Sequence, residues 1–194
     1  MKNVTMFVFM WTMLITGCSS TTETVSLTNA VAANDPVQSE TNSNPLMVLL
    51  VRHAEKADSS EDPELTDLGR ARASALAEIL RDAEIEHVHS SDYIRTKSTA
   101  APTAAKHGLE VELYDARNLN SLVEEIRETG GRHLVVGHSN TTPTVVELLG
   151  GTPGSAINEP GEFDRLYIVN ICKHGTVNTV LVRYGEPYQV IVDY

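Results

Sequence analysis

The chain has 194 residues, of which 41% are hydrophobic, and a formal net charge of −11. This length is enough for one domain with a substantial core. Nucleic-acid-binding domains usually carry a basic face, so the acidic balance and the 15 scattered Lys and Arg residues argue against DNA or RNA as a main partner.

Residues 1–17 have the pattern of a secretory signal peptide: Lys2 precedes an apolar run, residues 4–15, that is short for a membrane span. Residues 15–18 (Ile-Thr-Gly-Cys) then resemble the lipobox of bacterial lipoproteins, in which the signal is removed and Cys18 is lipidated. The alternatives are an ordinary signal peptide or a short core helix. Ser19, in place of Asp, implies an outer-membrane lipoprotein facing the periplasm, anchored in the cell envelope by its acyl chains.

Residues 18–45 predict a lipidated cysteine followed by a flexible tether. Small and polar residues dominate this stretch, which cannot bury enough apolar surface to offset the entropy of ordering. The folded domain is therefore expected at residues 46–194. Cys172 would be its one cysteine, and its place in a strand-like run predicts a small buried side chain.

Strand and helix patterns alternate along the domain. Strands are predicted at 47–51, 86–90, 109–114, 133–137, 163–172, 176–184 and 188–194, and helices at 67–82, 93–107, 119–129 and 143–149. Thr66 is expected to cap the first helix, and the pair Ser91-Asp92 to cap the second. This order predicts a three-layer α/β/α domain with a mainly parallel central sheet and antiparallel C-terminal edge strands.

Polar side chains follow three of these strands: Arg52 and His53 after the first, Arg95 after the second, and His138 with Asn140 after the fourth. Parallel strands bring their carboxyl ends to one edge of the sheet, where open α/β folds bind ligands. Two Arg and two His side chains would form a cationic pocket there. A tetrahedral dianion, such as a phosphoryl group, fits such a pocket because guanidinium groups offer paired donors to its oxygens.

Four motifs carry a family resemblance. They are Arg52-His53-Ala54-Glu55, Leu65-Thr66-x-x-Gly69, Ser91-x-x-x-Arg95-Thr96-x-x-Thr99-Ala100 and Gly137-His138-Ser139. In this order and spacing they resemble the histidine phosphatase superfamily, also called phosphoglycerate mutase-like, across residues 46–194. The resemblance implies a phosphatase that needs no metal or other cofactor and hydrolyses a phosphomonoester or a phosphohistidine, on a small molecule or a phosphoprotein.

The resemblance also implies roles for single residues. His53 would be the nucleophile that accepts the phosphoryl group, while Arg52, Arg95 and His138 would bind its oxygens. A hydrogen bond to one ring nitrogen would keep the attacking nitrogen of His53 unprotonated. Asn140 would either touch the ligand or cap the following helix.

The general acid is where the chain departs from the family. One branch carries Asp directly after the second His, where this chain has Ser139. Glu55, two residues after the nucleophile, is the preferred candidate acid, although it could instead orient Arg52 or face solvent. Asp115, after the third strand, is the second candidate. Because the sequence does not identify the general acid, the alternative function is a phosphate- or phospholigand-binding lipoprotein without turnover.

Two further observations have a structural interpretation. His87 and His89 would share one face of a strand, like a pair of metal ligands, but the sequence indicates no third ligand, so no metal site is expected. Ser91 is interpreted as a turn or cap residue rather than a nucleophile.

Overall fold

The computed structural model describes residues 45–188. The elements run in the order β1 (Leu46–Arg52), α1 (Asp67–Ile79), β2 (His87–Ser91), α2 (Ile94–His107), β3 (Val111–Tyr114), α3 (Leu119–Thr129), β4 (Arg132–Gly137), α4 (Thr141–Leu148), β5 (Arg165–Ile171) and β6 (Val177–Arg183). The predicted signal peptide, Cys18 and nearly all of the tether lie outside the described residues, and so does the strand expected at 188–194 beyond its first residue.

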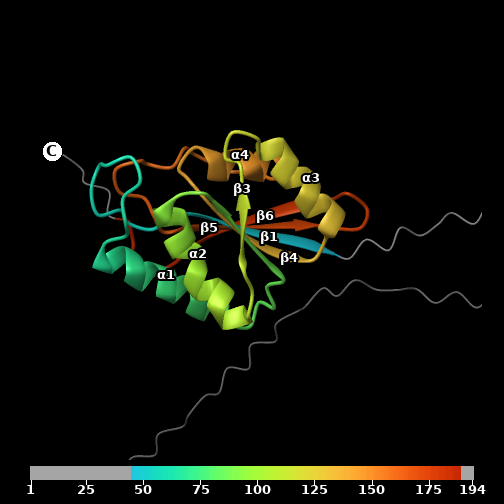
Figure 1. The fold of residues 1–194 in the computed structure, drawn as a ribbon. Helices are drawn as coiled ribbons and strands as arrows, with labels where there is room; N and C mark the ends of the chain where they lie inside the picture. The colour runs from blue at the N-terminus through green and yellow to red at the C-terminus, as the bar shows by residue number, and fades with distance from the viewer. Residues whose placement is uncertain (1–44, 189–194) are drawn as a thin grey trace, which may run out of the picture. The chain divides into compact units, whose positions relative to one another are not determined.

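The strands form one six-stranded sheet in the order β3-β2-β4-β1-β5-β6. Strands β3, β2, β4 and β1 run parallel to one another, whereas β5 pairs antiparallel with both β1 and β6. Helices α1 and α2 cover one face of the sheet, and α3 and α4 cover the other (Figure 1). The predicted three-layer α/β/α architecture with a mainly parallel sheet is thereby confirmed.

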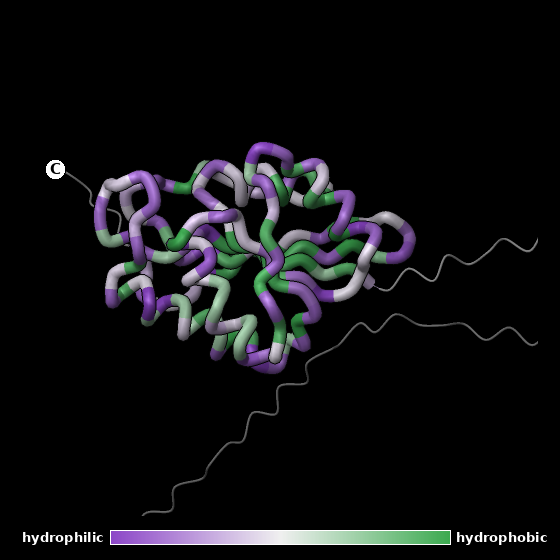
Figure 2. Tube along the Cα trace, viewed as in Figure 1, coloured by the Kyte–Doolittle hydropathy of each residue, from purple (hydrophilic) through white to green (hydrophobic). Residues whose placement is uncertain are grey.

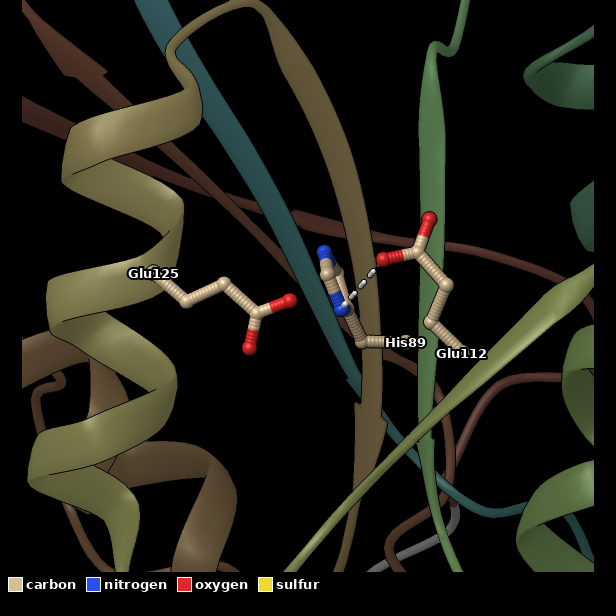
Figure 3. Close-up of side chains that lie close together, drawn as sticks. All are labelled: His89, Glu112 and Glu125. Carbon is tan, nitrogen blue, oxygen red and sulfur yellow. Dashed lines mark ion pairs between the residues drawn. The ribbon is translucent and has the colours of Figure 1, made fainter.

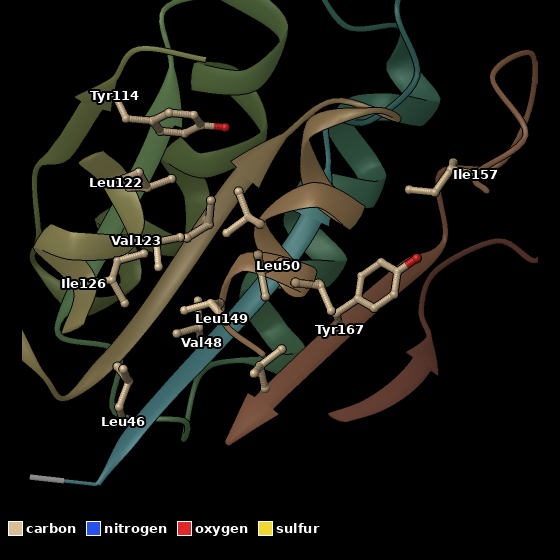
Figure 4. Packing of buried hydrophobic residues seen from close by; sticks show 14 residues of the cluster. Leu46, Val48, Leu50, Tyr114, Leu122, Val123, Ile126, Leu149, Ile157 and Tyr167 are labelled. Carbon is tan, nitrogen blue, oxygen red and sulfur yellow. The ribbon is translucent and has the colours of Figure 1, made fainter. Parts of the chain in front are cut away.

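Strand β1 is buried on both faces, as its unbroken apolar run predicts. Val48 and Leu50 pack into the cluster beneath α3 and α4, which Figure 4 shows in close-up. Leu49 and Val51 point to the opposite face, into a second cluster that includes residues of α1 and α2. The hydropathy-coloured trace shows the same arrangement, with the apolar segments gathered in the strands at the centre (Figure 2).

The start of α1 lies close to the segment that follows β1. The Thr66 hydroxyl accepts a hydrogen bond from the Gly69 amide at 2.9 Å, which confirms the predicted cap. A Cβ atom on Gly69 would collide with the carbonyl oxygen of Glu55. Only glycine therefore allows α1 to pack this closely behind the residues that follow His53.

Two local predictions were wrong. Ser91 is the last residue of β2 and is fully buried, so it does not cap α2, whose cap residue Tyr93 makes no side-chain capping bond. Cys172 is exposed rather than buried, because β5 ends at Ile171 and Cys172 begins the turn into β6. The Cys172 amide and carbonyl both bond within that turn, to Thr176 and Gly175.

No helix among residues 45–188 is both long and apolar enough to cross a bilayer.

Candidate functional site

A pocket of about 450 Å³ lies where β1, β2 and β4 end. It brings together four of the residues selected from sequence, namely His53, Arg95, His138 and Asn140. The parallel register of β1 and β4 places Arg52 opposite Gly137, so the residues that follow the two strands emerge side by side. These four residues therefore converge at the carboxyl edge of the sheet.

His53 is held as a neutral ring with one free nitrogen. Its Nδ1 lies 2.8 Å from the carbonyl oxygen of Ala54, and a carbonyl can only accept, so Nδ1 carries the proton. Nε2 is left with its lone pair. Burial, reinforced by the positive charges of Arg52 and Arg95, lowers the pKa of His53 to about 3. The nucleophilic form of the ring is therefore the stable one near neutral pH.

His138 is oriented by the hydroxyl groups of Ser91, at the end of β2, and of Thr96, in the first turn of α2. The Thr96 hydroxyl donates to the Ser91 carbonyl, at 2.7 Å, and accepts from the Ser91 hydroxyl at 3.1 Å. The Ser91 oxygen then accepts from Nε2 of His138 at 2.9 Å. Burial and the nearby charge of Arg95 lower the pKa of His138 to about 4. Its ring meets that of His53 edge-on, with centroids 5.4 Å apart.

Arg52 is almost fully buried and binds the loop that precedes β5. Its Nη1 donates to the carbonyl of Glu162 at 3.2 Å, and its Nη2 donates to Oε1 of Glu159 at 3.0 Å. The guanidinium lies over the ring of Phe163, 4.1 Å from its centroid. Arg52 does not itself line the His53 pocket, but its partner Glu159 does.

Arg95 lines the pocket and lies over the ring of Tyr93, 4.3 Å from its centroid. Its Nη1 is 3.4 Å from a carboxylate oxygen of Asp62. Nε of Arg95, like Nε of Arg52, is buried without a hydrogen-bond partner among the described residues. Both guanidinium groups thus keep a donor that the protein does not use.

Asn140 is exposed and is the cap residue of α4, but its side chain makes no capping bond. The amide is therefore available to a ligand in the pocket. Thr141 performs the local hydrogen bonding instead, since its hydroxyl accepts from the amide of His138 at 2.9 Å.

Neither carboxylate selected from sequence as the acid lies in this pocket. Both oxygens of Glu55 accept from Nε of Arg72, at 2.9 and 3.1 Å, and Glu55 lines a separate groove of about 690 Å³. Asp115 is exposed, and hydrogen bonds from the Arg117 amide and side chain lower its pKa. Glu55 is therefore held by a tertiary contact with Arg72 and Asp115 by a local one with Arg117, and neither carboxylate lines the pocket of His53.

Glu159 is the carboxylate that does line the pocket, and sequence reasoning missed it. Its side chain is 58% exposed; Oε1 accepts from Arg52, and Oε2 accepts from the hydroxyl of Ser139. Glu159 lies 107 residues from Arg52, in a turn-like Asn-Glu-Pro-Gly run. That run indicates a loop, but nothing in it indicates a return to His53.

A buried ion network holds the loop of Glu159 in place. The Glu162 carboxylate accepts from Arg165 at 2.7 and 2.9 Å, from Arg183 at 2.7 Å and from the amide of Asn158 at 2.8 Å. Burial alone would raise the pKa of Glu162, but these hydrogen bonds outweigh it and lower the pKa to about 2. The segment from Asn158 to Glu162 is thereby fixed over Arg52.

The buried histidines predict how stability depends on pH. His53 and His138 titrate near pH 6.5 when unfolded and at about 3 and about 4 when folded, so the unfolded chain binds more protons below pH 6.5. Their contribution to stability is complete above pH 6.5 and is lost as the pH falls toward about 4 for His138 and about 3 for His53. The free energy of unfolding should fall between pH 7 and pH 5, and this fall should be about 1–2 kcal/mol smaller in His53→Asn than in the wild type.

Urea unfolding at a series of pH values measures this slope. His174→Asn, in the exposed turn between β5 and β6, is the matched control and should keep the wild-type slope. If the free energy of unfolding of His53→Asn depended on pH as strongly as that of the wild type, His53 would not be a neutral buried ring in the folded state.

The comparisons with known proteins agree with this geometry. Residues 48–118 match the model of the histidine phosphatase superfamily (branch 1). No curated protein sequence matches significantly.

Among solved structures, the protein histidine phosphatase SixA complexed with tungstate is 20% identical, covering 71% of this chain and 97% of its own, with a TM-score of 0.57. The putative phosphohistidine phosphatase SixA from Agrobacterium tumefaciens is also 20% identical; the match covers 75% of this chain and 100% of that one, with a TM-score of 0.56. The mycobacterial glucosyl-3-phosphoglycerate phosphatase is 16% identical; the match covers 70% of this chain and 97% of that one, also with a TM-score of 0.56. The chain therefore has the phosphoglycerate mutase-like α/β fold, and the part of it that runs from β1 to the start of α3 matches the histidine phosphatase superfamily.

Proposed function

We propose that the chain is a member of the histidine phosphatase superfamily that hydrolyses a phosphomonoester or a phosphohistidine through a phosphohistidine intermediate on His53. The observation that carries this proposal is the state of His53, a buried neutral ring with Nδ1 bonded to Ala54 and Nε2 unprotonated, in a pocket shared with Arg95 and His138. The match of residues 48–118 to the superfamily model supports it independently.

In the first step, Nε2 of His53 attacks phosphorus and the bond from phosphorus to the leaving-group oxygen breaks. Arg95, which lines the pocket, stabilises the charge on the phosphoryl oxygens, and Arg52 joins it where a phosphoryl oxygen displaces the Glu159 carboxylate from its guanidinium. A bound dianion favours the protonated form of His138, which then donates from Nδ1. In the second step, water attacks phosphorus and releases His53. The positive charge in this route comes from side chains, so it needs no metal in the pocket.

We assign the proton donor to Glu159 rather than to Glu55 or Asp115. Glu159 lines the His53 pocket and lies on Arg52, where a phosphoryl oxygen would also bind. The phosphoryl group competes with the Glu159 carboxyl group for that guanidinium, which releases the carboxyl group to act as the general acid beside the leaving-group oxygen. The carboxyl group then donates its proton to the leaving-group oxygen, and it takes a proton back from the attacking water.

The substrate class follows from the rim of the pocket. Lys56 and Arg117 are exposed and line the pocket together with His53, so they extend the positive charge outward. A small phosphorylated molecule or a phosphorylated segment of a protein would meet these two cations before it reaches His53.

Removing the nucleophile tests the proposed reaction. Wild-type protein should hydrolyse an aryl phosphate, and His53→Ala should lower kcat by about a thousandfold or more because no covalent intermediate can form. Arg52→Ala should also abolish measurable turnover. Acid-labile, base-stable phosphate on His53, trapped from a labelled substrate, is the second measurement.

Phosphate trapped on another residue would contradict the mechanism. A wild-type protein that binds phosphate without turnover would favour the alternative, a non-catalytic phospholigand-binding lipoprotein.

The acid assignment predicts a dependence on the leaving group. Glu159→Gln should slow hydrolysis of an alkyl phosphate by about a hundredfold, because a poor leaving group needs the proton. An aryl phosphate with a good leaving group should change by less than about threefold. The ratio of the two kcat/KM values is the measurement.

Glu55→Gln is the matched control, since it makes the same chemical change in a carboxylate outside the pocket and should keep the wild-type ratio. A faster reaction of Glu159→Gln on both substrates would instead mean that Glu159 only competes with phosphate for Arg52.

We also propose that the domain is held at the cell envelope through lipid attached to Cys18. Replacing Cys18 tests this anchor. The support is the Ile-Thr-Gly-Cys run that ends at Cys18 after an apolar segment. Cys18→Ala should move the protein from the membrane fraction to the soluble fraction of the periplasm, measured by fractionation and immunoblotting, because no acyl chain can then be attached. An unchanged membrane fraction would argue against lipidation.

A further inference from the structure

A second cluster of ionisable side chains lies between the sheet and α3. His89 extends from β2, Glu112 from β3 and Glu125 from α3, and the two carboxylates approach His89 from opposite sides (Figure 3). One nitrogen of His89 and one oxygen of each carboxylate all lie within 4.8 Å of one another. None of the three residues lines the pocket of His53.

The proton positions in this cluster follow from a backbone carbonyl. His133, fully buried on β4, has its Nε2 2.8 Å from the carbonyl oxygen of Gly130, so Nε2 carries a proton. Burial favours the neutral imidazole, which leaves Nδ1 of His133 as an acceptor. Nε2 of His89 lies 2.9 Å from that nitrogen and must therefore donate to it.

His89 consequently presents an unprotonated Nδ1 to the two carboxylates. The side chain is only 2% exposed, and Nδ1 makes no hydrogen bond within the described residues; the nearest Glu112 oxygen, Oε2, is 3.7 Å away. Three electron-pair donors thus face one another with no proton between them. A cation placed between the three groups would be attracted by all of them.

Neighbouring side chains hold the first of these carboxylates in place. Nδ1 of His87 lies 3.0 Å from Oε1 of Glu112, and the acceptor nature of the carboxylate means that His87 donates. The Glu112 oxygen on the other side, Oε2, remains directed at His89. The ring of His87 also stacks on that of His133, with centroids 4.7 Å apart. Metal ligands in proteins are commonly oriented by such outer hydrogen bonds.

We propose that Nδ1 of His89 and the carboxylates of Glu112 and Glu125 bind a divalent transition-metal ion of the zinc class. Imidazole nitrogen and carboxylate oxygen are both ligands that Zn²⁺ accepts, and water can take the fourth position, whereas Ca²⁺ and Mg²⁺ prefer oxygen ligands alone. Glu125 is exposed, so the ion can enter from solvent. Bound there, it ties α3 to β2 and β3 and stabilises the fold.

Titration of the full chain, purified without an affinity tag and freed of metal by a chelator, tests the proposal. Zinc chloride should bind at one equivalent by calorimetry and raise Tm, because the ion binds the folded state alone. Glu125→Gln should weaken zinc binding at least tenfold and remove the rise in Tm. Glu125 is an exposed residue of α3, so this variant should fold.

Glu124→Gln is the matched control: it removes the same charge from the adjacent exposed residue of α3 and should bind zinc as the wild type does. Magnesium chloride should give no shift in Tm. Zinc binding that is unchanged in Glu125→Gln, or equally weakened in Glu124→Gln, would overturn the site. So would a magnesium response equal to that of zinc, because it would exclude the imidazole as a ligand.

Discussion

The parallel pairing of β1 with β4 is the constraint on which the rest of the site depends. Arg52 lies opposite Gly137, and the His53 amide donates to the Gly137 carbonyl at 2.9 Å, so the chain positions of His53 and His138 are set by one ladder of backbone bonds. Gly137 allows this approach because a Cβ there would lie 2.8 Å from the Thr141 hydroxyl. Thr141 in turn bonds the His138 amide. The backbone positions from which the two rings extend therefore follow from sheet geometry rather than from loop conformation.

Charge burial is the second organising feature. Arg52 is 1% exposed, and an unpaired guanidinium at that depth would cost several kcal/mol. The loop before β5 offsets this cost with two carbonyls and the carboxylate of Glu159. The loop is itself held by the buried pair of Glu162 and Arg165. The same contacts therefore solvate Arg52 and place a carboxylate in the pocket of His53, so one loop contributes both to stability and to the composition of the candidate site.

In two groups of histidines, a backbone carbonyl determines the tautomer of an imidazole ring. A backbone carbonyl, of Ala54 for His53 and of Gly130 for His133, determines which ring nitrogen is protonated. At the carboxyl edge of the sheet this leaves a nitrogen suited to attack phosphorus. Beneath α3 it leaves Nδ1 of His89 facing Glu112 and Glu125, the three groups of the proposed metal site. In both places burial keeps the imidazole neutral.

The sequence by itself determined the elements and the main convergence of the site. Apolar runs identified the buried strands, Thr66 marked the start of α1, and the alternation of strand and helix specified a parallel sheet whose edge gathers His53, Arg95 and His138. These features follow from local periodicity and from the geometry common to all parallel sheets.

Only the tertiary structure decided which carboxylate meets which cation. Glu55 bonds Arg72, while Glu159 reaches Arg52 across 107 residues. Glu125 lies beside His89 from helix α3, which the spacing of His87 and His89 could not indicate. Cys172 is exposed because β5 ends one residue earlier than its strand-like pattern implies. These contacts depend on the paths of loops and on packing between layers, and no local pattern of residues encodes either of them.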